Sequence, residues 1–187
     1  MAFSFTGAGP QRQEAVPLDF TQIGSILEDY RQKGYYPSAV CQVFDGTHTL
    51  YHRAFGAVSP DTWFDLASVS KIICTAMRLF AMEAGRLAPE DRVLDLLPAE
   101  APGPVTRERL RETTLLQLMT HTSGIVPWYP FYTDGRDFYT VLEHVLDTTP
   151  PEPGMAYSDL NFMLLGLIFQ QVTGLTLREG LDLYFRE

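Results

Sequence analysis

Two neighbouring segments of this sequence have the residue pattern of β-strands, and no other segment does. Residues 38–44 and 49–55 read as strands, and the Asp45-Gly46 pair between them is a hairpin turn signal. An isolated two-stranded ribbon is only marginally stable in water. The rest of the chain must therefore cover it, which predicts an α+β fold with one antiparallel hairpin.

The other apolar residues recur mostly at helical spacing. Gly34, Gly85 and Gly174 each follow such a segment, as expected where a helix ends. Thr114 and Thr176 precede two others and are predicted to cap them. Helices are predicted over residues 20–30, 68–84, 114–120, 136–146, 160–172 and 176–185, with a short helix or turn over 89–97.

The acidic balance of the chain argues against two classes of partner. The 187 residues carry 14 basic and 23 acidic side chains, a net charge of -9, which disfavours nucleic acid and anionic membranes. No apolar run is long enough to span a membrane, and residues 1–14 lack the features of a secretory signal, so we expect a cytoplasmic protein. Residues 1–17, rich in Gly, Pro and Gln, are expected to form a loose N-terminal segment.

Neither a metal nor a cofactor is expected. The four histidines are scattered, and Cys41 and Cys74 form no cluster with zinc spacing. We expect both cysteines to be small buried hydrophobes, and the sequence leaves a disulfide between them open.

The most distinctive chemical feature is Ser68-Val69-Ser70-Lys71, because Lys71 and Lys33 are the only lysines. Arginine stays protonated near neutral pH, whereas a partly desolvated lysine can exchange its proton. At a predicted helix start, Lys71 lies one turn after Ser68, so the two side chains share a helix face. The pattern indicates an activated serine nucleophile.

Tyr157-Ser158-Asp159 is the second part of this pattern. In extended backbone Tyr157 and Asp159 point to the same side, so the tyrosine is placed to pass a proton to a leaving group. Taken one by one, the residues also have plain structural interpretations. Ser68 suits a helix cap, Lys71 a solvated surface position and Tyr157 a core or rim aromatic. It is the ordered combination that favours acyl transfer.

The same segments resemble a known family. Residues 64–71 (FDLASVSK) resemble the nucleophile segment of the serine β-lactamase and penicillin-binding superfamily, most closely its class C branch of DD-peptidases and β-lactamase-like esterases. Residues 115–124 (LLQLMTHTSG) are similar to the branch's helix-to-turn signature. Pro153-Gly154, Tyr157-Ser158-Asp159, residues 162–166 and residues 172–174 follow in its order, so the resemblance covers nearly all of the chain.

The resemblance implies an antiparallel sheet with packed helices plus a helical subdomain. It implies that Ser68 is the acylated nucleophile, that Lys71 is the general base or proton shuttle, and that Tyr157 is the second proton-transfer group; which of the two is the base stays open. The backbone N–H of Ser68 would be half of an oxyanion hole. His121 and Ser123 match positions that look structural in the family.

The chain departs from the family in two places. Asp159 stands where the family usually has Asn; its charge is expected to raise the pKa of Lys71 and to alter which substrates bind. The family's third motif, a Lys-Thr-Gly or His-x-Gly strand, has no counterpart in the 187 residues. We therefore expect residues 18–187 to be the N-terminal portion of the hydrolase domain, with one hairpin of its sheet.

The resulting functional prediction is a serine hydrolase acting on an amide or ester, namely a β-lactam, a D-amino peptide or a carboxylic ester, through an acyl-serine intermediate. The isolated chain is expected to be impaired without the third motif. The alternative is a non-catalytic module that pairs through its exposed sheet edge with a missing C-terminal half or with itself.

Overall fold

The computed structural model describes residues 19–99 and 101–185. Within them the fold is α+β, as predicted, with eight α-helices and one two-stranded antiparallel sheet. The chain divides into two compact units, one ending at Asp65 and the other beginning at Leu66, and each is described by itself. The loose segment predicted for residues 1–17 lies outside the described residues.

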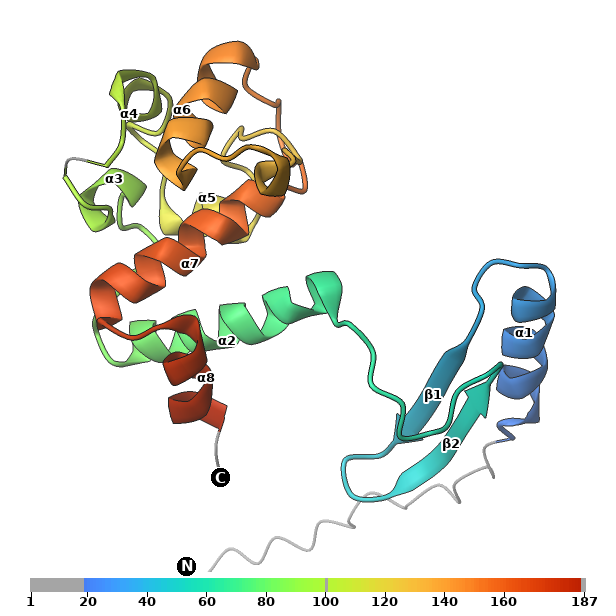
Figure 1. Cartoon of the computed structure of the whole chain (residues 1–187). Helices are drawn as coiled ribbons and strands as arrows, with labels where there is room; N and C mark the ends of the chain where they lie inside the picture. Colours follow the sequence, from blue (N-terminus) through green and yellow to red (C-terminus); the bar gives the residue numbers. More distant parts are fainter. Residues whose placement is uncertain (1–18, 100, 186–187) are drawn as a thin grey trace, which may run out of the picture. The chain divides into compact units, whose positions relative to one another are not determined.

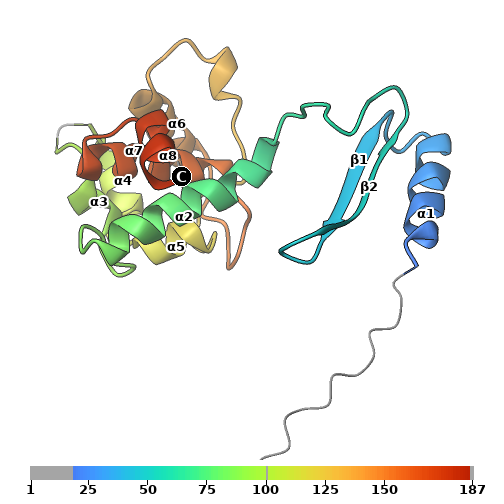
Figure 2. The same cartoon turned by 90° about the horizontal axis from the view of Figure 1, so that it is seen from below.

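The first unit is a hairpin covered by a helix. Strands β1 (Ala39–Phe44) and β2 (Thr49–Phe55) pair antiparallel, which confirms the predicted hairpin. The Asp45 carboxylate accepts the backbone N–H groups of Thr47 and His48 at 2.8 and 2.7 Å and closes the turn. Helix α1 (Thr21–Gln32) lies along the ribbon and contacts β2, as Figures 1 and 2 both show.

The second unit is helical within its described part. The helices in chain order are α2 (Ser70–Glu83), α3 (Val93–Leu96), α4 (Pro104–Arg109), α5 (Leu115–Met119), α6 (Phe138–Thr148), α7 (Asp159–Thr173) and α8 (Leu177–Phe185). Helix α7 lies in the middle of the unit and contacts α2, α3, α5 and α8 (Figures 1 and 2). Helix α4 packs on α6.

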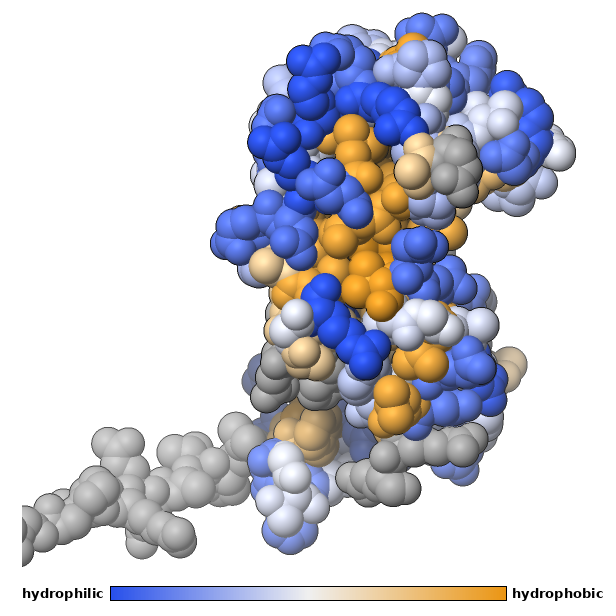
Figure 3. All heavy atoms as spheres, turned by 90° about the vertical axis from the view of Figure 1, so that its left-hand side faces the viewer, coloured by the Kyte–Doolittle hydropathy of each residue, from blue (hydrophilic) through white to orange (hydrophobic). Residues whose placement is uncertain are grey.

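The core of this unit is built around the buried residues of α7, which meet buried leucines and valines of α5 and α6. Burial of such side chains from water is the main force that holds the helices together. Gly180 allows α8 to approach closely, because a Cβ there would lie 2.6 Å from Phe169 Cζ. Figure 3 shows a band of apolar side chains between hydrophilic ones on the face that lies to the left in Figure 1.

The predicted helix signals are largely confirmed. Thr114 and Gln117 form a reciprocal capping box at the start of α5. Gly174 ends α7 in the left-handed conformation, with φ 71°. Thr176 and Glu179 exchange hydrogen bonds at the start of α8. These local signals depend on residues three or four apart, which is why the sequence reveals them.

Other predictions need correction. Ser68 does not lie in the first turn of an α-helix, because a 3-10 turn (Ala67–Val69) precedes α2 and Ala67 has a φ of 44°. Helix α6 begins after its cap Asp137 rather than at Arg136. Helix α4 and the 3-10 turn Phe131–Thr133 are too short for an apolar period and were not predicted. The cysteines are free thiols and half-buried rather than buried.

Among the described residues, no single helix is both long and apolar enough to cross a bilayer. Helices α7 and α8 would reach the required length and composition only together, and they are bent by 75° relative to each other.

Candidate active site

Ser68 and Lys71 meet at the start of α2. Ser68 is exposed in the 3-10 turn, and Lys71 follows in the first turn of the helix. The Lys71 ammonium donates a hydrogen bond to Ser68 Oγ at 3.1 Å. The two side chains therefore share one face, as their spacing predicts, even though the serine lies in a tighter turn than expected.

Tyr157 and Asp159 reach the same lysine from the start of α7. Between them, Ser158 is extended and buried, with φ -131° and ψ 125°, so its two neighbours turn to the same side. Lys71 Nζ lies 2.7 Å from Asp159 Oδ1 and 5.0 Å from the centroid of the Tyr157 ring. The structure thus brings together all four predicted site residues.

The charges of the site favour an ammonium at Lys71 and a more acidic phenol at Tyr157. Burial acts to lower the pKa of Lys71, but hydrogen bonds to Asp159 and then Tyr157 outweigh it, and the pKa is raised above its usual value. The pKa of Tyr157 is lowered, first by hydrogen bonding with Ser68 and then with Lys71. Of the two candidate bases, the phenol is thus the one whose deprotonated form the site stabilises.

His121 and Ser123 hold the backbone of the site. His121 Nδ1 accepts the Ser158 N–H at 3.0 Å, and the Ser158 hydroxyl donates to the Val126 carbonyl at 2.7 Å. Ser123 donates to the side-chain oxygen of Asn161 at 2.6 Å, and the Asn161 amide lies 3.3 Å from His121 Nδ1. Burial, followed by the charge of Lys71, lowers the pKa of His121, which keeps Nδ1 available as an acceptor.

Asn161 is a further residue of the site that the sequence motifs do not include. It is 1% exposed and is the polar interruption at the start of an otherwise apolar helical run. A buried amide requires hydrogen-bond partners, and that polar position is the signal that points to it.

Two cavities flank Lys71, and Ser68 and Phe162 line both of them. The larger, about 690 Å³, extends past Asp159 between α2, α7 and α8. The smaller, about 450 Å³, lies on the side of His121 and Tyr157. A substrate carbonyl bound at Ser68 would therefore have space on both sides, one for its acyl part and one for its leaving group.

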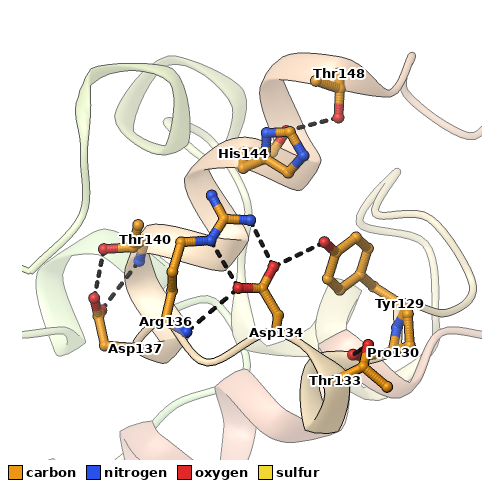
Figure 4. A network of polar contacts seen from close by, with 9 residues as sticks. All are labelled: Tyr129, Pro130, Thr133, Asp134, Arg136, Asp137, Thr140, His144 and Thr148. Atoms are coloured by element: carbon orange, nitrogen blue, oxygen red, sulfur yellow. Dashed lines mark hydrogen bonds and ion pairs between the residues drawn. The ribbon is translucent and has the colours of Figure 1, made fainter.

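A polar network in the loop before α6 supports one wall of the larger cavity. Asp134 accepts hydrogen bonds from the Tyr129 hydroxyl at 2.9 Å and from the Arg136 guanidinium, as Figure 4 shows. Asp137 then caps α6, whose first residue, Phe138, lines the cavity and stacks on Phe131 with ring centroids 5.2 Å apart. The loop is thereby fastened at the point where it forms part of the site.

Arg78 is an unusual buried cation two turns after Lys71 on α2. It is 2% exposed, and its Nη1 donates to the Cys74 carbonyl at 2.5 Å. Its Nε and Nη2 find no hydrogen-bond partner among the described residues, and its guanidinium carbon lies 5.7 Å from the Phe162 ring centroid. Burial lowers the pKa of this guanidinium to about 10. No sequence pattern indicates this arrangement, because the lack of partners for Nε and Nη2 results from tertiary packing.

Within the described part of the chain, no three His, Cys, Asp or Glu side chains are grouped so as to hold a metal ion.

The family model described as Beta-lactamase matches residues 23–182. The chain belongs to the β-lactamase family. Members of this family are serine hydrolases, and the predicted resemblance is thereby confirmed. The match includes the hairpin and the segments that carry Ser68, Lys71 and Tyr157.

A curated relative is Penicillin-binding protein 4 of Amycolatopsis lactamdurans. It is 30% identical over 171 residues, which cover 85% of this chain and 44% of the relative. The chain spans less than half the length of the first curated relatives that it matches.

Solved structures of the family share the fold. A D-stereospecific amidohydrolase from Streptomyces sp. has a TM-score of 0.73 at 23% identity, over 90% of this chain and 54% of that one. A class C β-lactamase in complex with cefoxitin has a TM-score of 0.69 at 21% identity, over 88% and 48%. At these identities the likeness supports the β-lactamase fold over part of its length.

Proposed function

We propose that Ser68 is the nucleophile of an amide or ester hydrolase and that Tyr157, as its phenolate, is the general base. The observation that carries the proposal is the contact of Lys71 Nζ with Ser68 Oγ at 3.1 Å, with the Tyr157 ring centroid 5.0 Å from the same Nζ. Lys71 acts as an ammonium that stabilises the phenolate. This assignment chooses between the two bases that the sequence left open, because the pKa of Lys71 is raised and that of Tyr157 is lowered.

In the acylation step, the Ser68 hydroxyl loses its proton to the Tyr157 phenolate while Oγ forms a bond to the substrate carbonyl carbon. The bond from that carbon to the leaving oxygen or nitrogen then breaks, and the phenol returns its proton to the leaving group. Water hydrolyses the acyl-Ser68 ester by the same sequence of proton transfers. The backbone N–H of Ser68 is proposed as one oxyanion donor; a missing second donor costs about 10²–10³-fold in rate.

Covalent labelling tests this proposal directly. The chain is incubated with a fluorescent penicillin and with p-nitrophenyl acetate, and intact mass is measured as a function of time. We expect one acyl group per chain, no adduct in Ser68→Ala, and unchanged labelling in Ser59→Ala, an exposed serine of the first unit. Absence of any adduct on the folded chain would contradict the proposal.

A second candidate is a module that pairs with another chain. Among the described residues, β1 and β2 pair only with each other, so each strand presents an outer edge that can bind a further strand. This candidate predicts a concentration-dependent mass in sedimentation that is lost when Cys41, in β1, is replaced by proline. A monomer with normal Ser68 labelling would exclude it.

A further inference from the structure

The larger cavity next to Ser68 has a charged end and an apolar body. Ser68, Lys71 and Asp159 lie at the charged end. The body is lined mainly by apolar side chains of α2, α6, α7 and α8, namely Cys74, Phe138, Phe162, Met163, Leu167 and Leu177. Its volume of about 690 Å³ is within the range of small-molecule sites. A ligand that fills it should therefore combine a polar head with a bulky apolar group.

Most of the unused hydrogen-bonding capacity at the charged end belongs to Asp159. Two of the three Lys71 N–H groups have partners in Asp159 and Ser68, and the ammonium lies 5.0 Å from the centroid of the Tyr157 ring. The Asp159 carboxylate can accept about four hydrogen bonds, and among the described residues Lys71 is the one side chain that donates to it. The Asp159 side chain is 42% exposed, against 19% for Lys71. This end of the cavity is therefore short of donors.

We propose that this cavity binds the α-ammonium group and the apolar side chain of an α-amino acyl donor, with Asp159 as the residue that selects the ammonium. The inference rests on the proposed acylation of Ser68 and names its substrate class: esters or amides of α-amino acids with a large apolar side chain. Ser68 Oγ and Asp159 Oδ1 both bond the same Nζ. A carbonyl carbon at Ser68 thus places a nitrogen two bonds away beside the carboxylate.

The same arrangement disfavours substituents other than an ammonium group at the α-carbon of the acyl donor. A carboxylate would meet the negative charge of Asp159, and two of the N–H groups of Lys71 already bond Asp159 and Ser68. A carbonyl oxygen would find no donor in the Asp159 side chain, and a buried unpaired acceptor lowers binding. A hydrocarbon without an amine would fill the apolar body but leave the carboxylate without its second partner.

A matched pair of substrates tests the proposal. The p-nitrophenyl esters of phenylalanine and 3-phenylpropionic acid differ only in the α-amine, which is protonated at pH 6. We expect kcat/KM for the amino ester, as the D- or L-enantiomer, to exceed that for the other ester by about tenfold or more. Asp159→Asn should reduce this ratio below about threefold, whereas Asp147→Asn, an exposed control with the same charge change, should leave it intact. The ratio is independent of changes in Lys71 or Tyr157 that slow both esters equally.

A binding measurement separates this inference from the proposed catalysis. In Ser68→Ala, calorimetry with phenylalaninol and 3-phenylpropanol should show the same tenfold preference for the amine, again lost in Asp159→Asn. If Ser68 is never acylated but this preference persists, the proposed catalysis fails and the ammonium site stands. Equal affinities, or a preference for the alcohol without an amine, would overturn the site whatever the enzyme assay shows.

Discussion

Lys71 Nζ lies 2.7 Å from Asp159 Oδ1, so the lysine beside the candidate nucleophile is half of an ion pair. The partner carboxylate comes from the first residue of α7, and the contact holds this residue against α2. Because the pair favours the protonated amine, Lys71 is a fixed positive charge in the proposed mechanism, and proton acceptance is proposed for Tyr157.

Replacing Asp159 by Asn should lower the pKa of Lys71, because the hydrogen-bonded negative charge that raises it is removed. With only two lysines in the chain, reductive ¹³C-methylation gives two resolved lysine signals for NMR titration. The Lys71 signal should titrate at lower pH in Asp159→Asn, and the Lys33 signal, from a lysine paired with Asp29, serves as the internal control. A Lys71 titration that is unchanged would show that the ion pair does not control this amine.

The rate of Ser68 acylation should follow a bell-shaped pH profile. The rising limb reports deprotonation of Tyr157, whose pKa is lowered by Ser68 and Lys71, so it should lie below the range of a free phenol. The falling limb reports loss of the Lys71 proton, whose pKa is raised, so it should lie above that of an ordinary lysine. Tyr157→Phe should slow acylation by about 10²–10⁴-fold. If Tyr157→Phe retains the rising limb, Tyr157 is not the base.

Arg78→Met should stabilise the chain by about 1–4 kcal/mol, because it replaces a buried, incompletely paired cation with an apolar side chain of similar length. Urea unfolding followed by circular dichroism measures the effect. Arg109→Met is the matched control: its Nη1 donates to the Leu146 and Thr149 carbonyls at 2.7 and 2.8 Å, so the same change there should destabilise. Loss of stability in Arg78→Met would mean that the guanidinium has a favourable role in the folded chain.

The hydrogen bonds of Asp134 with Tyr129 and Arg136, in the loop before α6, should persist at a pH that protonates ordinary carboxylates. Hydrogen bonds from Arg136 are the main cause that holds the pKa of Asp134 well below its usual range. A carboxyl group with a depressed folded-state pKa contributes its stability above its unfolded pKa and loses it only as pH falls through the folded value. Fluorescence anisotropy of Trp128 in a Trp63→Phe background should therefore stay constant through pH 4. Asp134→Asn should lower the anisotropy at neutral pH. A fall in anisotropy above pH 4 in the chain that retains Asp134 would contradict the depressed pKa of this carboxyl group.

Features that depend on neighbours in sequence were predictable. The hairpin, the Thr114 cap and the end of α7 at Gly174 follow from local spacing, and so does the shared face of Ser68 and Lys71. The shared side of Tyr157 and Asp159 followed from strand alternation, which applies because Ser158 is extended.

Features that depend on contacts between distant segments were not predictable. His121 meets Ser158 across 37 positions, and Asn161 meets Ser123 across 38. No period or cap signal encodes such pairs. The isolation of the Arg78 guanidinium is likewise visible only once α2 has packed on α7, because side-chain partners depend on which elements become neighbours.

Ser158 determines where two neighbouring side chains lie, although it is not itself one of the proposed catalytic residues. Its backbone and hydroxyl are both tied down, to His121 and Val126, and the residues on either side of it are Tyr157 and Asp159. One anchored residue thus orients two candidate site residues, and loosening it would release the proposed proton acceptor and the carboxylate that pairs with Lys71 together. A substitution of Ser158 that breaks these hydrogen bonds should therefore displace Tyr157 and Asp159 together. The positions of the two flanking side chains are coupled through the residue between them.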